Sequence, residues 1–274
     1  MPDDTRETTP SAPDYLHGYS APVRRSHSWR TVANSAAYLE PRLRPGLDLL
    51  DVGCGVGTLT ADLATRVAPG RVVGVDASAE VLTAAAAAAA AHGVDVELLV
   101  ADATALPFAA ASFDVVHLHQ VLQHVPDPVA VLREARRVLR PGGTVAARDA
   151  VYASTVAVPE DPDLVAWRET YRRTARALGT EPDAGAHLAR WARAAGFTDV
   201  VVSASAWAFS DPADRQWWAS TWAERTDTVL RPRFAAGGPG EEDRTDAMVA
   251  AWRRWADVED AWMSMTHGEV LLRA

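Results

Sequence analysis

The stretch LDLLDVGCGVGTLT, at residues 47–60, places a carboxylate just before three closely spaced glycines. Asp51 lies at the end of a short apolar run, and Gly53, Gly55 and Gly57 follow at every second position. Because glycine has no Cβ, backbone at such a bend can approach a bound molecule closely and can adopt unusual dihedral angles. A helix expected directly after the bend would add exposed N–H groups and the positive end of its dipole. The stretch therefore predicts a binding site for a nucleotide-like ligand.

Two further carboxylates follow later apolar runs. Asp76 ends the run RVVGVD about 20 residues after Gly57, where nucleotide-binding folds place an acid that accepts hydrogen bonds from ribose hydroxyls. Asp102 follows the next apolar run. The glycine spacing is G-x-G-x-G, with Thr58 where the third glycine of a dinucleotide site would fall. The spacing and the acids favour S-adenosylmethionine over a nicotinamide dinucleotide.

The composition is that of an acidic globular protein. Its 274 residues are 48% hydrophobic and carry a net charge of −9, so we expect no nucleic-acid partner, which would need clustered Lys and Arg. The single cysteine, Cys54, excludes a disulfide framework, and without a ligand motif such as H-E-x-x-H we predict no metal. No signal peptide and no bilayer-spanning stretch are recognisable, so we expect a cytoplasmic protein without a membrane partner.

Strands alternate with helices over the first half of the chain. Apolar runs predict strands at residues 47–52, 71–76, 94–100, 113–118 and 144–148, and helical sequence separates them at 58–67, 77–92 and 128–139. This alternation predicts an α/β fold with a mostly parallel sheet and helices on both faces.

The remaining segments suggest one elaborated domain. We predict a disordered tail at residues 1–14 and a single domain at 15–274. Within it, 15–45 form an N-terminal lid or cap, 46–150 the cofactor-binding core, and 151–274 substrate-side helices with the last two strands. The helices are expected at 163–177, 186–195, 211–231 and 244–257, and the strands within 196–209 and 262–272. Because strands flank the later helices, we interpret that block as an insertion before the last strand.

The motifs DVGCGVGTLT, VVGVDAS, ADATALPF, FDVVHLHQVLQHVPDP and LRPGG resemble, in this order and spacing, those of class I S-adenosylmethionine-dependent methyltransferases. Within that superfamily they are similar to the small-molecule enzymes of the ubiquinone/menaquinone-biosynthesis type. The resemblance covers roughly residues 25–150. It implies a Rossmann-like seven-stranded sheet in the order 3-2-1-4-5-7-6, with the last strand antiparallel. It also implies methyl transfer from S-adenosylmethionine to a C, O or N atom of a natural-product or quinone-like molecule.

The resemblance further implies how the strand ends would hold the cofactor. Asp51 and the glycine bend would face the methionine part, Asp76 the ribose, and Asp102 the adenine. The other implied contacts are Ala77 and Ala103 beside the adenine and the backbone of His119 at the methionine amine.

Aromatic and histidine residues precede the core. Tyr19, His27 and Trp29 are candidates for a lid over the cofactor, and apolar spacing after Trp29 predicts one helix that ends near Pro41. The alternative is a cap that only packs on the sheet.

Acceptor contacts are expected after the fourth and fifth strands. Methyl transfer is an in-line displacement, so the protein must align nucleophile, carbon and sulfur, and it needs a base only for a protonated acceptor. Gln120, Gln123 and His124 share one face of a helical turn. We predict that the glutamines contact the acceptor and that His124 is the base; a histidine bonded to backbone is the alternative. Arg148 and Asp149 are predicted to bind a polar acceptor or to pair with each other.

Other interpretations stay open at this point. One is a nicotinamide-dependent oxidoreductase, which the glycine spacing disfavours. Another is a protein that binds S-adenosylmethionine but catalyses a rearrangement without methylation. A homodimer is kept as a hypothesis.

Five tryptophans of the C-terminal part recur at helical spacing: Trp217, Trp218, Trp222, Trp252 and Trp255. This spacing is typical of side chains packed in a core. The alternative is that some of them line a pocket for the acceptor.

Overall fold

The computed structural model describes residues 28–236 and 241–273 of the chain. The predicted tail and the lid candidates Tyr19 and His27 lie outside these ranges. Within the described residues, no helix combines the length and the apolar character that a bilayer crossing requires.

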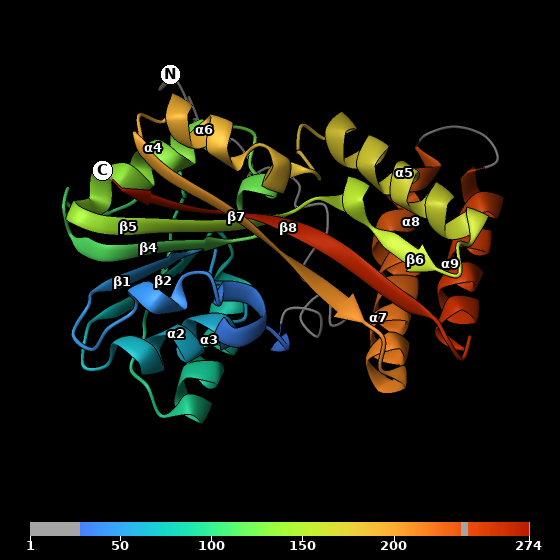
Figure 1. Ribbon diagram of the computed structural model, residues 1–274, viewed down its shortest axis with the longest axis horizontal. Coiled ribbons are helices and arrows are strands. Elements are labelled where there is room, and N and C mark those ends of the chain that lie inside the picture. The colour runs from blue at the N-terminus through green and yellow to red at the C-terminus, as the bar shows by residue number, and fades with distance from the viewer. Residues whose placement is uncertain (1–27, 237–240, 274) are drawn as a thin grey trace, which may run out of the picture.

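One mixed sheet runs through the molecule (Figure 1). Strands β3, β2, β1, β4 and β5 are parallel neighbours in that order, and β8 pairs antiparallel with β5 on one edge and with β7 on the other. The bounds are β1 (Leu49–Val52), β2 (Val72–Asp76), β3 (Glu97–Val100), β4 (Phe113–His119), β5 (Leu139–Ala150), β6 (Val156–Val158), β7 (Asp199–Phe209) and β8 (Trp262–Arg273). The expected fold class and strand order are confirmed, and the short β6, which pairs with β8 beyond the end of β5, is an extra strand.

Helices cover both faces of this sheet (Figure 1). The turn η1 and helix α2 pack on one face, and α4 and α6 on the other. The α-helices are α2 (Thr58–Val67), α3 (Ala79–His92), α4 (Pro128–Val138), α5 (Pro162–Ala177), α6 (Leu188–Ala194), α7 (Pro212–Arg225), α8 (Arg231–Ala235) and α9 (Glu241–Ala256). The short turns are η1 (Val32–Ala36), η2 (Glu40–Arg42), η3 (Leu122–His124), η4 (Tyr152–Ser154), η5 (Ala184–Ala186) and η6 (Thr226–Leu230).

Two short turns replace the single helix predicted before the first strand. A capping box at Thr31 starts the π turn η1, and the separate 3-10 turn η2 contains Pro41. Proline has no N–H with which to continue a helical hydrogen-bond ladder. The prediction of one continuous helix is therefore wrong, although Val32, Ala36 and Leu39 of this segment are buried as its spacing implied.

Other boundaries also differ from the prediction. Strand β5 begins at Leu139, before the predicted start, but its pairing with β4 is irregular there. Leu139 pairs with Phe113 and Thr144 with Val115, so the RPGG segment between them bulges out of the ladder. The helix predicted at 211–231 is divided into α7, η6 and α8. Pro232 lies in the first turn of α8, where its missing N–H is tolerated, so the helix restarts there.

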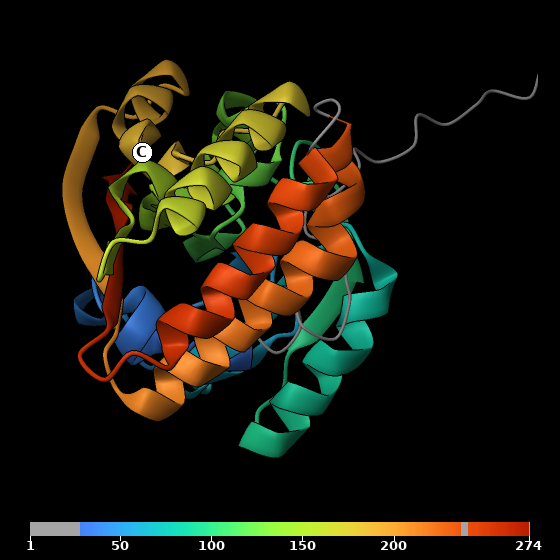
Figure 2. The same cartoon turned by 90° about the vertical axis from the view of Figure 1, so that its right-hand side faces the viewer.

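Beyond the parallel strands, α5, α7 and α9 enclose an aromatic core. Figure 2 shows α7 and α9 side by side. Trp167 makes edge contacts with Trp222 and Trp252, with ring centroids 4.7 and 4.9 Å apart. The predicted core packing of the tryptophans is confirmed for Trp218, Trp222, Trp252 and Trp255, and Trp217 is partly buried against the same cluster.

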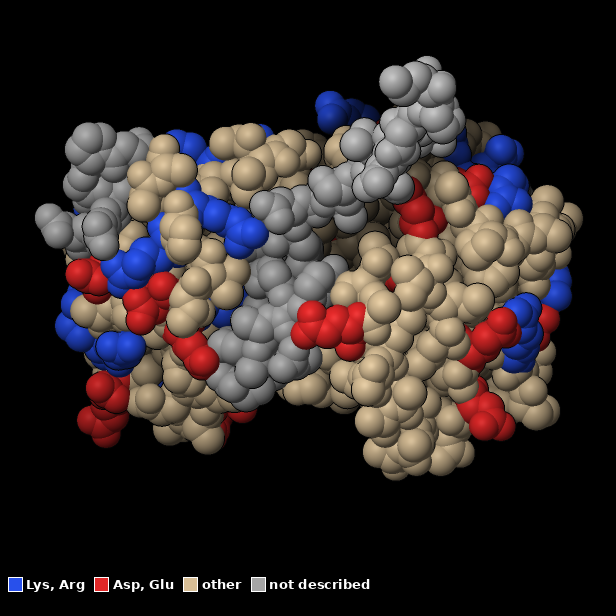
Figure 3. Space-filling model, turned by 180° about the vertical axis from the view of Figure 1, so that it is seen from behind, with Lys and Arg blue, Asp and Glu red and all other residues tan. Residues whose placement is uncertain are grey.

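The charged surface differs between the two halves (Figure 3). Acidic and basic side chains intermingle over the helical half, where ion pairs such as Arg254–Asp161 and Arg231–Asp227 tie neighbouring segments. The surface over α3 is largely uncharged, because the alanine run supplies its exposed residues.

The aromatic core gives a direct stability prediction. Trp252 is 1% exposed and Trp262 is 40% exposed. Trp252→Ala would lower the free energy of unfolding by about 3–5 kcal/mol, because it leaves a cavity, whereas Trp262→Ala would cost about 1 kcal/mol or less. Urea unfolding followed by circular dichroism measures both. Equal losses in the two variants would contradict the assignment of the core.

Candidate functional site

Of the three glycines in the bend, only Gly55 has open space where a side chain would be. All three have positive φ. A Cβ on Gly53 would lie 2.5 Å from Val121, and one on Gly57 would lie 2.6 Å from Ala85, so close packing requires these two glycines. At Gly55, with φ +55°, no atom lies within 4 Å of an added Cβ. Backbone at Gly55 is therefore accessible to a ligand at the carboxyl ends of the strands.

Asp76 is fixed beside this opening. Its Oδ2 accepts a hydrogen bond from the Gly55 N–H at 3.0 Å, and its Oδ1 accepts one from the Ser78 N–H at 3.0 Å. Burial raises the pKa of Asp76, and the backbone donors oppose that rise. Each carboxylate oxygen keeps a second lone pair, so the group can still accept hydrogen bonds from two adjacent hydroxyls.

The adenine-side candidates lie at the ends of β2 and β3. Ala77 is exposed directly after Asp76. Asp102 is exposed after β3, and its Oδ1 accepts hydrogen bonds from the Thr104 N–H and hydroxyl, both at 2.8 Å. Ala103 is half-buried beside it. The three parallel strands thus bring these residues and the glycine bend to one edge of the sheet, as predicted; their contacts with adenine stay predictions.

Asp51 lies under the glycine bend and is bonded on both sides. Its Oδ2 accepts from the Thr60 hydroxyl at 2.5 Å, and its Oδ1 lies 2.7 Å from His117 Nδ1. The carboxylate is 3% exposed. It therefore ties β1 to α2 and β4, and its predicted contact with the methionine part of the cofactor stays a prediction.

Gln120 connects three distant segments at the end of β4. Its backbone has φ +55°, which is uncommon for a residue with a side chain and is typical of functional sites. Its Oε1 accepts from Arg30 Nη2 at 2.5 Å, and its Nε2 lies 3.0 Å from His267 Nε2. The amide predicted to contact the acceptor is thus engaged within the protein. Arg30 and His267 were missed by sequence reasoning, because nothing local to them signals a partner so far along the chain.

Gln123 and His124 contact each other. Gln123 is 3% exposed, and its Nε2 lies 2.9 Å from His124 Nε2. Burial lowers the pKa of His124 to about 3, and the charges of Arg225 and Arg30 act in the same direction. The ring is therefore neutral near pH 7, and its Nε2 is engaged by the Gln123 side chain; the role of His124 as the base stays a prediction.

Arg148 and Asp149 point to opposite faces of β5. Arg148 Nε lies 3.3 Å from Glu269 Oε1 and 3.1 Å from Ser205 Oγ, so Arg148 pairs with Glu269 and not, as one prediction had it, with Asp149. Asp149 is fully buried, and its Oδ1 accepts from the Gln123 N–H at 3.1 Å. Burial raises the pKa of Asp149 to about 8. Asp149 therefore anchors the turn after β4 and is largely protonated at neutral pH.

Aromatic rings form a wall on the side of the sheet that carries His117 and His119. Trp29 packs on Trp207 of β7, with ring centroids 5.1 Å apart, and on Phe209 at 5.7 Å. His119 lies 6.0 Å from Trp207 and is stacked 6.3 Å from His117. The lid candidate Trp29 thus belongs to a wall beside the end of β4.

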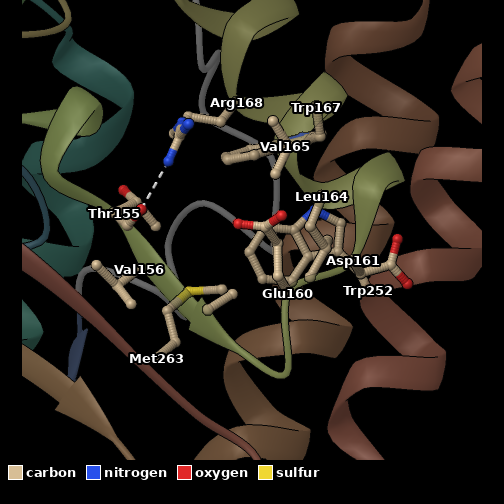
Figure 4. A pocket seen from close by; sticks show the side chains of 11 residues that line it. Thr155, Val156, Glu160, Asp161, Leu164, Val165, Trp167, Arg168, Trp252 and Met263 are labelled. Carbon is tan, nitrogen blue, oxygen red and sulfur yellow. Dashed lines mark hydrogen bonds between the residues drawn. The ribbon is translucent and has the colours of Figure 1, made fainter.

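A separate pocket of about 170 Å³ lies in the helical half, between β6, α5 and α9 (Figure 4). Leu164, Trp167 and Met263 supply apolar walls, and Arg168 donates to the Thr155 carbonyl at 2.7 Å. None of the predicted site residues lines it. Within the described ranges, no group of three or more His, Cys, Asp or Glu side chains is placed to hold a metal ion.

Comparison with known proteins identifies relatives of this arrangement. The family model described as a methyltransferase domain matches residues 50–147. An uncharacterized methyltransferase of Schizosaccharomyces pombe, C1B3.06c, is 30% identical over 270 residues, which cover 94% of this chain and 96% of the relative. A demethylmenaquinone methyltransferase of Lactococcus lactis is 44% identical over 102 residues, but these cover only 36% of this chain and 40% of the relative.

Solved structures share the fold. The [4+2]-cyclase SpnF superposes with a TM-score of 0.53 at 22% identity, over 92% of this chain and 80% of that chain. The similarity to the menaquinone-type enzyme is confined to less than half of the chain, whereas the yeast protein matches almost end to end.

The buried carboxyl group of Asp149 predicts a pH-dependent stability. Its folded-state pKa of about 8 lies above the value near 4 of an unfolded aspartate, so the native chain holds a proton that the unfolded chain releases. The free energy of unfolding would therefore fall by up to about 1.4 kcal/mol per pH unit as pH rises from about 4 to about 8. The Asp149→Asn variant can still accept a hydrogen bond from the Gln123 N–H, but its free energy of unfolding would not show this fall with rising pH.

Urea unfolding of both proteins at pH 5, 6, 7 and 8 measures the difference. Parallel pH curves for the wild type and the asparagine variant would show that Asp149 is ionised in the folded chain and would contradict the assignment.

Proposed function

The chain belongs to the class I S-adenosylmethionine-dependent methyltransferases, and we propose that it methylates a small natural-product or quinone-like acceptor. One observation supports the assignment of the cofactor to particular residues: the open backbone at Gly55 lies next to the carboxylate of Asp76, which hydrogen bonds hold in place. An adenosyl ligand needs both, because its ribose presents two hydroxyls and its chain must pass close to backbone. When bound, S-adenosylmethionine supplies a methyl group on a positively charged sulfur.

The protein's own contribution is positioning. Asp76 would accept from the ribose hydroxyls, and Asp102 with Ala77 and Ala103 would border the adenine. Asp51, held by His117 and Thr60, would keep the glycine bend in place under the methionine part. Methyl transfer needs alignment of nucleophile, carbon and sulfur and exclusion of water, and side chains held at fixed strand ends support both.

The acceptor would lie beside the wall of Trp29 and Trp207. Residues from 151–274 contribute Trp207, His267 and Glu269 to the same edge as the core strands. We therefore propose that this second half selects the acceptor and that the two halves work as one domain. Flat rings pack well on such a wall, which supports an aromatic or quinone-like acceptor.

A matched pair of glycine variants tests the cofactor site. Gly55 and Gly93 both have positive φ and open space at an added Cβ, but Gly93 ends α3 far from the strand ends. Each alanine variant would lose about 1 kcal/mol of stability from its backbone conformation. Gly55→Ala would also weaken binding of S-adenosylhomocysteine at least tenfold, because its methyl group enters the ligand's space. Calorimetric titration measures this, and equal affinity in the two variants would refute the placement.

The exposed edge of β7 supports a homodimer. Val201 and Val202 are 52% and 59% exposed, and residues 200–209 carry no charged side chain. Among the described strands β7 pairs only with β8, and an unpaired edge can pair with a second copy without bringing like charges together. Light scattering would give a dimer mass for the wild type and for Val100→Lys, a control on the opposite edge strand, and a monomer mass for Val202→Lys. A monomeric wild type would exclude the homodimer.

A further inference from the structure

His119 is a buried histidine whose ring has no partner among the described residues. It is 6% exposed, and neither Nδ1 nor Nε2 makes a hydrogen bond there. Burial, with the positive charges of Arg30 and Arg148, holds the pKa of His119 well below its usual range. The ring is therefore neutral near pH 7 and offers one acceptor nitrogen and one N–H donor.

The neighbouring histidines are engaged differently. His117 Nδ1 is bonded to Asp51, and His267 lies between Gln120 and the Met265 carbonyl. His124 Nε2 lies 2.9 Å from the Gln123 side-chain nitrogen. Of these four rings at the strand ends, His119 is the one whose two nitrogens both lack a protein partner in the described chain.

The position of His119 joins the cofactor side to the aromatic wall. It ends β4, next to β1 and its glycine bend, and its ring centroid lies 6.3 Å from that of His117 and 6.0 Å from that of Trp207. A group bound against Trp207 at this end of the sheet would be close to both His119 and the strand ends that hold the cofactor.

The charge at this place distinguishes possible acceptors. Arg148 lies with its Cζ 5.0 Å from the centre of the Trp207 ring, and neither of its terminal nitrogens makes a hydrogen bond in the described chain. Both terminal nitrogens are buried donors, which suit an oxygen that gains negative charge. The nearby carboxylate of Glu269 already pairs with Arg148 Nε, so an ammonium group would face the guanidinium and a neutral imidazole, neither of which carries negative charge.

From this arrangement we infer that His119 is a catalytic residue that takes the proton of a phenolic or enolic hydroxyl, so that the methyl acceptor is oxygen. The inference rests on the proposed methyl transfer and narrows it to one substrate class. The acceptor O–H bond breaks and its proton passes to a ring nitrogen of His119. The oxygen lone pair forms the bond to the methyl carbon, and the electron pair of the carbon–sulfur bond returns to sulfur. The products are a methyl ether, S-adenosylhomocysteine and a protonated His119, which then loses its proton to water.

The first test compares acceptors of similar shape. The wild type is incubated with methyl-labelled S-adenosylmethionine and either 2-naphthol or 2-(aminomethyl)naphthalene, whose amine is an ammonium group near neutral pH. We expect label in the naphthyl methyl ether and at least tenfold less in the amine. Label only in the amine, or on ring carbon, would overturn the inference while leaving methyl transfer intact. Transfer to none of a wider panel of phenols, enols, amines and carbon acceptors would instead count against the proposed function.

The second test separates a proton acceptor from a packing residue. His119→Phe keeps a flat ring against Trp207, and His92→Phe on the exposed face of α3 is the control. With 2-naphthol, His119→Phe would lower kcat at least 100-fold, whereas binding of S-adenosylhomocysteine would stay within threefold of the wild type. With 4-nitrophenol, which is already ionised near neutral pH, the loss would shrink to less than tenfold. The control variant would match the wild type throughout.

Two results would contradict the assignment. Equal losses of kcat with both phenols would indicate a positional role for the ring. Loss of S-adenosylhomocysteine affinity in step with activity would show that the ring of His119, and not only its backbone, belongs to the cofactor site.

Discussion

The parallel register of β1 between β2 and β4 is the constraint on which the site depends. It pairs Asp51 with Gly74 on one side and with His117 on the other, so the three strands end at one edge. Everything proposed for the cofactor follows from this alignment, because the glycine bend and Asp76 come from different strands and meet only there. A shift of β2 by one residue would turn the Asp76 side chain to the other face and separate it from Gly55.

Polar groups occupy one face of the sheet at this edge, where a core is normally apolar. Asp51 with His117, and Arg148 with Glu269, are buried pairs that carry a desolvation cost. Apolar residues would pack the same space more stably, so their presence points to a demand of binding or chemistry. The aromatic rings of Trp29 and Trp207 border this polar face and keep it away from bulk water.

Local patterns could be predicted from the sequence, and long-range contacts could not. The glycine bend and Asp76 lie within one strand-turn-helix-strand unit, whose spacing specifies their meeting. Arg30, His267 and Glu269 reach the site over separations of 90, 147 and 121 residues, through pairs with Gln120 and Arg148. The contacts of His267 and Glu269 depend on the register between β5 and β8, and that of Arg30 depends on how the segment before β1 packs; the sequence reveals neither. For the same reason the sequence could not show that Arg148 pairs with Glu269 and not with Asp149.

The central claim is that this strand edge recognises an adenosyl sulfonium compound. Equilibrium dialysis of the purified chain against labelled S-adenosylmethionine, with NADH dialysed in parallel, tests it most directly. We expect saturable uptake of one S-adenosylmethionine per chain, displaced by S-adenosylhomocysteine, and no uptake of NADH. Retention of NADH, or no retention of either sulfur compound, would contradict the account.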